Sequence, residues 1–500
     1  MELLKTLQKY SIWVVFINFF LTLPLQSNSF GSPQLMQTID TSTTTPFPCC
    51  NTDLKQFLVV WSNAENIIQY MIYNSDSTIA TNLQFLDAAN SYTSNIIYSV
   101  YNSHNQQYFV VWIDTSNYIK FAFLDAAGNV LSVHTTTFFV DTGSSYAPTV
   151  NVIWNSQTHE YFVYWFNGDT FYLKYAIFDE NGNSALGETT STISVIDGGF
   201  LGSYNPHRNE YFIPSIASTT NDVQYTIFNA AGEIITQNAS DFQFQCTADS
   251  IASVYNTATH QYFFIWLDYY SRGLGFAICD EDGNVVNQSF LNYPLTNNSV
   301  YGLSYNAVNN QFLITVLFLE GSPSLNQYYL LICDSNGNLV SSPSAIPNMT
   351  AATTTSPGDT RLNTVFNAYL DKDNCIFISW LSWFIVGTVT DNKGFPDFAA
   401  PIFNTYFIDL PQDAPSNFKG NRLLNRFVNY GEYVNILTWS EVTSSGVVSY
   451  NLYHEGVFLV SLPVTQTNYE QHNQPNTQTT YTLKSVNQNG EEGNATSISF

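Results

Sequence analysis

The segment YNSHNQQYFVVW, residues 101–112, decides the fold of this chain because versions of it recur about every 51 residues. Most versions begin with an aromatic residue and Asn, cross a short polar turn and end in an apolar run. A fixed period of this length indicates a repeat architecture. We expect seven copies, whose second residues are Asn51, Asn102, Asn155, Asn205, Asn256, Asn306 and Leu370.

Each repeat contains four strand-like runs separated by turns. In the second repeat they cover residues 95–101, 107–113, 118–124 and 130–138, which are rich in aromatic and β-branched residues. The turn before the fourth run has Asp or Asn first and Gly fourth, which is typical of a type I turn followed by a residue with positive φ. Four antiparallel strands per repeat predict an all-β fold, a seven-bladed β-propeller over residues 30–410. The alternative is an open solenoid, which needs polar end caps that the apolar end copies lack.

The seventh repeat departs from the period. We assign its hairpin turn to Asp391-Asn392-Lys393-Gly394. The preceding excess of residues falls in Ser341–Arg361, which is rich in Ser, Thr and Pro and is expected to form a long surface loop. Short residues recur near the first strands and suit an innermost strand crowded at a central axis: Ser99, Gly202, Ser203, Ser253, Gly302 and Ser304.

The repeats stop at residue 410, and residues 411–500 carry a different pattern. Pro415 opens it, Ile436-Leu437-Thr438-Trp439 follows, and strand-like runs occur at 448–453 and 480–487. This part resembles a fibronectin type III domain. The resemblance implies an immunoglobulin-like β-sandwich in which Trp439 packs between the sheets and Tyr481 hydrogen-bonds back to the backbone at a corner. No Arg-Gly-Asp tripeptide supports integrin recognition.

The N-terminus has the features of a secretory signal. Lys5 and Lys9 form a basic region, Ile12–Leu23 is largely apolar, and Ser27-Asn28-Ser29 supplies small residues for cleavage. We therefore expect residues 1–29 to be removed and the protein to be secreted or held at the cell surface. The apolar run is short for a membrane span of about 20 residues, and an uncleaved anchor is the alternative to a cleaved signal. After cleavage no stretch long enough to cross a bilayer remains in the sequence, so no membrane insertion is expected.

The charge balance restricts the partners. The chain has 14 Lys and Arg against 39 Asp and Glu, which gives a formal charge of −25. Binding to nucleic acid or to anionic lipid requires clustered basic residues, so neither partner is expected. Six cysteines are few for a secreted chain of this length, and we interpret most of them as small buried side chains.

No catalytic, cofactor-binding or metal-binding residue is predicted. The hairpin turns offer calcium ligands only at Asp179, Asp280 or Asp334, since the turn at 125–128 has alanines in the ligand positions. Four histidines fall in turns between first and second strands: His104, His159, His207 and His260. We expect these turns to lie far apart around the rim, so that the histidines do not converge on one metal.

One tryptophan position recurs at the end of the second strand, occupied by Trp61, Trp112, Trp165, Trp266 and Trp380. A regular aromatic position is expected to be core packing between blades rather than a carbohydrate platform. Contacts with a ligand are expected where the repeats disagree, which includes the 341–361 segment, Tyr269-Tyr270, Tyr328-Tyr329 and the segment from Trp380 to Trp383.

These features favour a secreted, non-enzymatic binding or adhesion protein that presents a propeller platform to an extracellular protein or glycan. The repeats resemble those of secreted bacterial proteins of unknown role. Two alternatives stay open, an extracellular hydrolase acting on carbohydrate through the central funnel and a purely structural surface component. A hydrolase should gather carboxylates or histidines at the axis. A binding module should present exposed aromatic residues instead.

Overall fold

The computed structural model of the 500-residue chain consists of β-strands joined by turns. It describes residues 34–39, 47–63, 66–75, 78–87, 97–141, 149–167, 171–196, 200–218, 220, 222–238, 246–268, 273–291, 301–318, 326–340, 343–351, 365–370, 375–382, 385–390, 396–398, 402–409, 415–426, 431–442, 447–487 and 492–500. The signal segment 1–29, Tyr269-Tyr270, Trp383 and the turn 391–394 lie outside these residues. Within them, no helix is long and apolar enough to cross a bilayer.

The repeat is a four-stranded antiparallel sheet, as the sequence predicts. In the second repeat β6 (Tyr98–Asn102), β7 (Gln107–Ile113), β8 (Tyr118–Asp125) and β9 (Val130–Phe139) pair in chain order. The first repeat contains β2 (Phe47–Asn51), β3 (Gln56–Ser62), β4 (Ile68–Asn74) and β5 (Ile79–Asp87), and the third contains β10 (Val150–Asn155), β11 (Glu160–Asn167), β12 (Tyr172–Asp179) and β13 (Ser184–Ile196).

The next three repeats have the same plan. The fourth contains β15 (Ser203–Asn205), β16 (Glu210–Ala217), β17 (Val223–Asn229) and β18 (Ile234–Asn238), while the short β14 (Phe200–Leu201) pairs in parallel with the first strand of the fifth repeat. The fifth contains β19 (Cys246–Asn256), β20 (Gln261–Asp268), β21 (Leu274–Asp280) and β22 (Val285–Leu291), and the sixth β23 (Tyr301–Asn306), β24 (Gln311–Phe318), β25 (Asn326–Cys333) and β26 (Ser344–Ala351).

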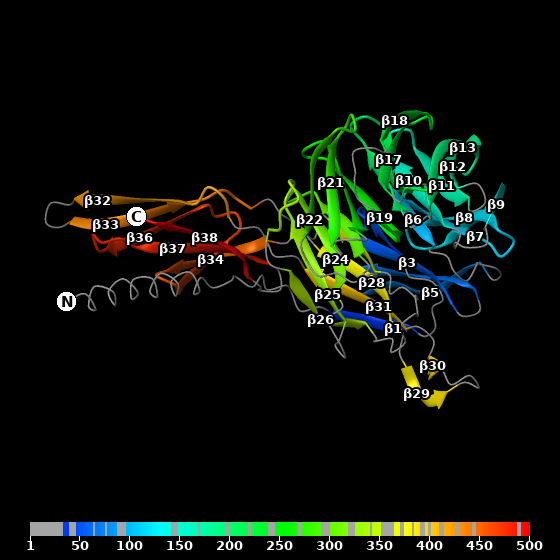
Figure 1. The fold of residues 1–500 in the computed structure, drawn as a ribbon. Coiled ribbons are helices and arrows are strands. Elements are labelled where there is room, and N and C mark those ends of the chain that lie inside the picture. Colours follow the sequence, from blue (N-terminus) through cyan, green and yellow to red (C-terminus); the bar gives the residue numbers. More distant parts are fainter. Residues whose placement is uncertain are drawn as a thin grey trace, which may run out of the picture.

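The seventh sheet is assembled from both ends of the repeat region. It contains β27 (Val365–Leu370), β28 (Cys375–Ser382), β31 (Ile402–Asp409) and, as its outermost strand, β1 (Gln34–Ile39). In Figure 1 the blue strand β1 lies beside the orange-yellow β31. The sheets follow one another through their first strands, because β2 contacts β6 and each later first strand contacts the next, until β27 contacts β2.

The predicted turn at 391–394 lies outside the described residues, but the strands before and after it do not belong to the seventh sheet, contrary to the expectation. β29 (Ile385–Thr390) and β30 (Pro396–Phe398) pair only with each other, and β31 takes the third place in the sheet. The sequence explains this arrangement, since β31 ends in Phe-Ile-Asp as β12 ends in Ile-Phe-Asp. The segment 385–398 is an insertion between the second and third strands.

The predicted surface loop at Ser341–Arg361 is also wrong in part, because Ser344–Ala351 forms β26 and pairs with β25. β26 is the outermost strand of its sheet. An outer strand has one paired edge and tolerates Pro347, which would disrupt a central strand. The low β-propensity of these residues therefore gave no indication of a strand. The strand is stabilised by its hydrogen bonds to β25.

Four of the five recurring tryptophans have described side chains, and these four are core residues, as predicted. Trp61, Trp112, Trp165 and Trp266 are at most 1% exposed. The apolar clusters that hold them extend across neighbouring sheets: Trp165 shares one with Phe109, and Trp112 shares another with Val60. Cys49 and Cys333 are likewise buried, and burial raises the pKa of each thiol to about 12. Ser215 and Val316 fill the tryptophan position in two other repeats and are also buried.

The Asn of the repeated phrase joins one sheet to the next. Asn102 Oδ1 accepts hydrogen bonds from the backbone N–H groups of His104 and Asn105, while its Nδ2 donates to the Tyr161 hydroxyl of the next repeat at 3.0 Å. The same bond links the amide of Asn51 to Tyr108, Asn155 to Tyr211 and Asn205 to Tyr262. All four asparagines are fully buried. The phrase is therefore a structural link between repeats.

The turns between third and fourth strands have the predicted geometry. Gly128, Gly182, Gly232, Gly283 and Gly337 have φ between +82° and +88°. An aromatic residue from the preceding repeat packs on several of these glycines, and the Tyr175 hydroxyl donates to the Gly232 carbonyl oxygen at 2.8 Å. A β-carbon at Gly182 would lie 2.9 Å from the Phe121 ring, so glycine is needed both for its φ and for this contact.

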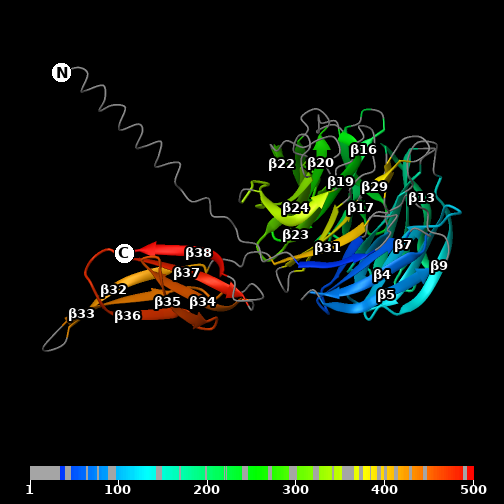
Figure 2. The ribbon, with the colours of Figure 1, turned by 90° about the horizontal axis from the view of Figure 1, so that it is seen from below.

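Residues beyond 415 form two further sheets, which Figure 2 shows as a body separate from the repeats. One contains β32 (Lys419–Arg426), β33 (Gly431–Thr438) and β36 (Asn468–Gln474). The other contains β34 (Val447–His454), β35 (Val457–Pro463), β37 (Thr480–Asn487) and β38 (Glu492–Ser499). Side chains from both sheets share one core that includes Trp439, as expected.

The Tyr481 hydroxyl does not make the backbone hydrogen bond that was expected of it. Tyr481 is fully buried on β37, but its hydroxyl accepts from Asn435 Nδ2 at 2.8 Å and donates to Gln471 Oε1 at 2.6 Å. The backbone bond is made by Tyr450, whose hydroxyl accepts from the Val442 N–H at 2.8 Å. Polar side chains on β33 and β36 lie within reach of Tyr481 and take the place of the backbone partner.

Candidate functional site

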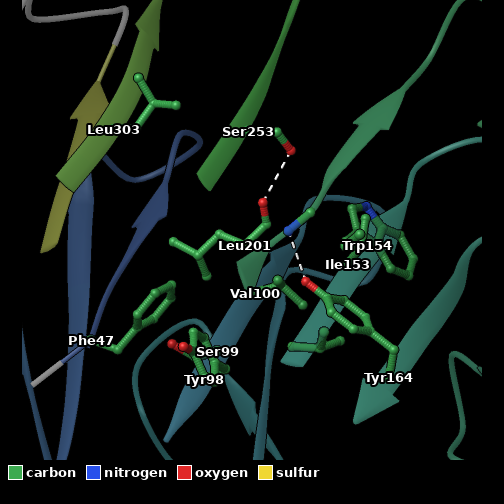
Figure 3. A pocket seen from close by; sticks show the side chains of 12 residues that line it. Phe47, Tyr98, Ser99, Val100, Ile153, Trp154, Tyr164, Leu201, Ser253 and Leu303 are labelled. Carbon is green, nitrogen blue, oxygen red and sulfur yellow. Dashed lines mark hydrogen bonds between the residues drawn. The ribbon is translucent and has the colours of Figure 1, made fainter. Parts of the chain in front are cut away.

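A cavity of about 260 Å³ lies where the first strands of successive repeats meet. Its wall is formed by Phe47, Tyr98, Ser99, Val100, Val152, Ile153, Trp154, Tyr164, Leu201, Gly202, Ser253 and Leu303. Six repeats contribute to this wall, so the cavity lies on the common axis. The small residues predicted for an innermost strand, Ser99, Gly202 and Ser253, are part of it (Figure 3).

Several polar groups of the wall are already paired within the protein. The Ser253 hydroxyl donates to the Leu201 carbonyl oxygen at 3.0 Å, and the Gly202 N–H donates to the Tyr164 hydroxyl at 2.8 Å, as the dashed lines in Figure 3 show. The Tyr164 hydroxyl in turn donates to the Phe200 carbonyl oxygen. These bonds fix the wall and hold the backbone of β14 close to the axis.

Trp154 offers a polar group that the protein leaves unused. Its indole Nε1 is shielded from solvent and has no hydrogen-bond partner among the described residues. An indole N–H that is buried without a partner carries a desolvation cost, which a ligand oxygen or a water would relieve. The prediction missed this residue. The signal was present, since Trp154 replaces the Tyr that precedes Asn in the neighbouring repeats.

The described wall contains no carboxylate and no imidazole. Acid–base chemistry on a glycosidic bond requires two carboxyl groups facing the bond. Glu210 and Glu281 have pKa values moved in opposite directions, which is the pattern of an acid–base pair. Neither lines the cavity, and Glu210 is only 8% exposed, so burial raises its pKa and also closes it to a substrate.

The four turn histidines do not lie far apart, as the sequence analysis expected; they form two pairs. The rings of His104 and His159 stack with centroids 3.7 Å apart, and those of His207 and His260 lie 4.2 Å apart. The turns of adjacent repeats approach because their first strands contact each other around a narrow axis. Each pair is joined by a glutamate from the next hairpin turn, Glu180 or Glu281.

The second cluster is an extensive network around Glu281. Its Oε1 lies 2.9 Å from His207 Nδ1 and accepts from the Tyr255 hydroxyl at 2.7 Å and from Asn205 Nδ2 at 3.0 Å. Burial acts to raise the pKa of Glu281, but these hydrogen bonds outweigh it and hold the pKa below its ordinary value. The Arg208 Nε lies 3.2 Å from the other carboxylate oxygen.

The carboxylates of the three aspartates considered for calcium accept hydrogen bonds from within their own turns. Asp280 Oδ1 accepts from the backbone N–H groups of Asp282 and Asn284, and its Oδ2 accepts from Asn284 Nδ2 at 2.9 Å. Asp179 and Asp334 make the same three contacts. For Asp179, burial raises the pKa, but the turn hydrogen bonds outweigh it and lower the pKa overall. These carboxylates therefore stabilise the hairpins.

Scans of the sequence against protein-family models and against curated proteins found no match. Among solved structures, the chain is similar to the BP39L lectin from Burkholderia pseudomallei, with a TM-score of 0.53, 11% identity, and coverage of 75% of this chain and 99% of that chain.

Two further solved structures are similar at lower scores. One is the six-bladed β-propeller lectin of Aleuria aurantia (TM-score 0.40, 15% identity, coverage 64% and 98%). The other is the propeller domain of the trilobed protease from Pyrococcus furiosus (TM-score 0.38, 8% identity, coverage 60% and 81%). The repeats thus give this chain an all-β, propeller-like fold, and the structural similarity extends to the fold alone.

Proposed function

We propose that this protein is a secreted, non-enzymatic glycan-binding protein. In this proposal residues 30–410 form a closed seven-bladed propeller, and residues 411–500 form a fibronectin type III module beyond it. The observation that carries the proposal is the wall of the axial cavity. It combines the aromatic residues Phe47, Tyr98 and Trp154 with serine hydroxyls and a buried indole N–H that has no partner in the described part of the chain.

A sugar matches this combination. Aromatic rings present flat apolar faces, against which the C–H face of a sugar ring packs. A sugar hydroxyl can accept the unused hydrogen bond of Trp154. The cavity volume of about 260 Å³ is slightly below the roughly 300–1,000 Å³ of sites for drug-sized ligands, which suits a ligand as small as one sugar residue. The solved structure with the TM-score of 0.53 is named a lectin, which is consistent with this proposal.

Seven blades and ring closure are supported by contacts between strands. The first strands β2, β6, β10, β15, β19, β23 and β27 contact one another in turn, and β27 contacts β2. β1 adds the outer strand to the last sheet. In the C-terminal part, the sheets β32-β33-β36 and β35-β34-β37-β38 have the strand division of a seven-stranded sandwich.

Glycan binding is tested with the full chain on a glycan array, followed by calorimetric titration of the best ligand. Trp154→Phe keeps an aromatic ring and removes the N–H, and we expect it to weaken binding about 2- to 10-fold, the effect of one hydrogen bond. Trp112→Phe is the matched control, because Trp112 Nε1 is also buried without a partner in the described structure but does not line the cavity. Equal affinity in both variants would place the ligand elsewhere.

The glycans that bind in these assays also serve to test the hydrolase alternative. Incubation of each bound glycan with the protein, followed by product analysis, should return it intact. Release of shortened glycan that is abolished by substituting one carboxylate would replace the binding proposal with an enzymatic one. Secretion is tested separately: the mature protein should begin at Phe30, which N-terminal sequencing of the exported chain measures.

A further inference from the structure

The two histidine clusters are copies of each other, displaced by two repeats. His104 and His207 both stand two residues after the linking Asn, His159 and His260 both stand four residues after it in the next repeat, and Glu180 and Glu281 both follow the first Asp of the hairpin turn. Each cluster therefore draws one residue from one repeat and two from the following repeat.

The scaffold does not require these residues. At three other junctions between consecutive repeats, the same positions hold Asp53, Gln106 and Ala126, then Gln157, Asn209 and Ala230, then Ala258, Asn310 and Ser335. These junctions contain the same turns, with positive φ at Gln106, Asn209 and Asn310 as at His159 and His260. The histidines and the glutamate occur together at two junctions and are all absent from these three. This joint occurrence indicates a common role.

The geometry of each cluster suits a single ion. One ligand atom from each of the three residues lies within 4.8 Å of the other two. Three ligands at the roughly 2.0–2.2 Å distances of a tetrahedral zinc site stand about 3.3–3.6 Å apart, so small side-chain rotations would bring them together. All six side chains are exposed or half-buried, so an ion can reach them.

We propose that His104, His159 and Glu180 form one Zn²⁺ site, and that His207, His260 and Glu281 form a second. Two imidazoles and one carboxylate are ligands for Zn²⁺ and similar transition ions, whereas Ca²⁺ and Mg²⁺ take oxygen ligands. Three protein ligands leave the fourth position of a tetrahedral ion to water or to an added ligand. Each ion would connect two neighbouring repeats. None of the six residues lines the axial cavity, and only His159, whose ring stacks 6.2 Å from the Trp154 ring, contacts a residue proposed for glycan binding.

The first site should bind the ion more tightly than the second. Oε2 of Glu180 is shielded from solvent, lies 3.8 Å from His104 Nε2 and accepts no hydrogen bond within the described structure. Glu281 already contacts Arg208, and the Tyr255 hydroxyl lies 3.0 Å from His260 Nδ1. An ion at the second site must displace the Tyr255 contact and sit near a positive charge, both of which weaken binding.

The experiment measures Zn²⁺ binding by the full chain after treatment with a chelator, using equilibrium dialysis with Zn²⁺ alone. We expect two ions per chain. His159→Asn and His260→Asn install the residue that sister repeats carry at this positive-φ position, so the backbone is preserved. Each should remove one ion per chain, and the double variant should remove both. His134→Asn, which alters a histidine outside both clusters, should retain two.

A second measurement keeps the outcome clear if a variant folds poorly. Glu180→Ala and Glu281→Ala install the alanine found at Ala126 and Ala230, and circular dichroism checks that the strands persist. Zn²⁺ should raise the Tm of the unmodified chain, because an ion that binds only the native state stabilises it. It should leave the Tm of a folded variant that carries both Glu180→Ala and Glu281→Ala unchanged. Equal Zn²⁺ binding by the unmodified chain and by either double variant, of the histidines or of the glutamates, would overturn the proposal, whatever the glycan experiments show.

Discussion

At the scale of single residues, the linking asparagines show how a side chain joins two repeats. Asn102 satisfies two backbone donors in its own turn and the hydroxyl of Tyr161 in the next repeat. Asn256 lacks such a tyrosine, since Phe312 occupies the position, and its Nδ2 donates instead to Asn310 Oδ1 at 2.7 Å. The turn contacts are therefore constant, and the contact with the neighbouring repeat varies.

Asn102→Ala should lower the free energy of unfolding by about 2–4 kcal/mol, because it leaves two backbone donors and a buried hydroxyl without their partner. Tyr161→Phe removes only the bond between repeats and should cost about 1 kcal/mol. Urea denaturation of the full chain measures both. If the two variants were equally destabilised, the turn contacts of Asn102 would contribute nothing to stability.

At the scale of elements, the hairpin glycines allow the cost of backbone strain to be separated from crowding. Gly182 has φ +82° and packs on Phe121, Gly456 has φ +77° with open space, and Gly187 is neither left-handed nor crowded. Alanine should cost more than about 2 kcal/mol at Gly182, about 1 kcal/mol at Gly456 and nothing at Gly187. Calorimetric unfolding of the three variants tests this order. A Gly182→Ala variant as stable as Gly187→Ala would contradict it.

The sheet β34-β37-β38 carries a pH-dependent contribution at Glu492. Burial acts to raise the pKa of Glu492, but hydrogen bonds from Asn451, Tyr453 and Lys484 outweigh it and lower the pKa. Because the folded pKa lies below the unfolded one, ionised Glu492 stabilises the native state above about pH 4.3, and this is lost as the pH falls through the folded pKa. Glu492→Gln should lower the Tm of the C-terminal sheets at pH 7.

The control for this prediction is acid. In acid strong enough to protonate Glu492, the variant and the unmodified chain should unfold at the same temperature, because both side chains are then neutral. Differential scanning calorimetry at the two pH values compares them. A Tm difference that persists in acid would assign the effect of the substitution to packing rather than to charge.

At the scale of the whole molecule, the seventh sheet depends on the start of the chain. Deletion of residues 34–39 removes β1 and exposes the hydrogen-bonding edge of β31. We expect a lower Tm and concentration-dependent association, measured by calorimetry and light scattering. Deletion of residues 1–29 alone should leave the Tm of the remaining chain unchanged, and a loss of stability in that control would contradict the assignment of this segment as a signal.

The repeats could be predicted from sequence because their signals are local. Alternating apolar runs and Asp-x-x-Gly turns predicted the strands of the second repeat to within three residues at each end. The pairing of β1 with β31 could not be predicted, because no short-range pattern relates two segments so far apart in sequence. β26 was missed because an outer strand tolerates residues that a loop also contains.

The ligand contacts expected from the sequence stay a prediction, because most of the residues named for them lie outside the described part of the chain. The rule that recognition lies where repeats disagree describes Trp154 and the histidine clusters, yet the prediction pointed to Tyr269, Trp383 and the 341–361 segment. The turn histidines were expected to lie far apart around the rim. How close adjacent turns come depends on how narrow the ring of first strands is, and that width depends on the size of the first-strand side chains.

The closing strand has a consequence for how the protein is made. Ile39 pairs with Phe403, 364 residues later in the chain. At about 5–20 residues per second, a ribosome takes roughly 20–70 seconds to produce the partner of a strand that it synthesised first. Throughout that interval the segment 34–39 lacks its partner strand, and its backbone can pair with any other strand in the nascent chain or in a neighbouring one. β1 can therefore take its place in the seventh sheet only after β31, at the end of the repeat region, has been synthesised.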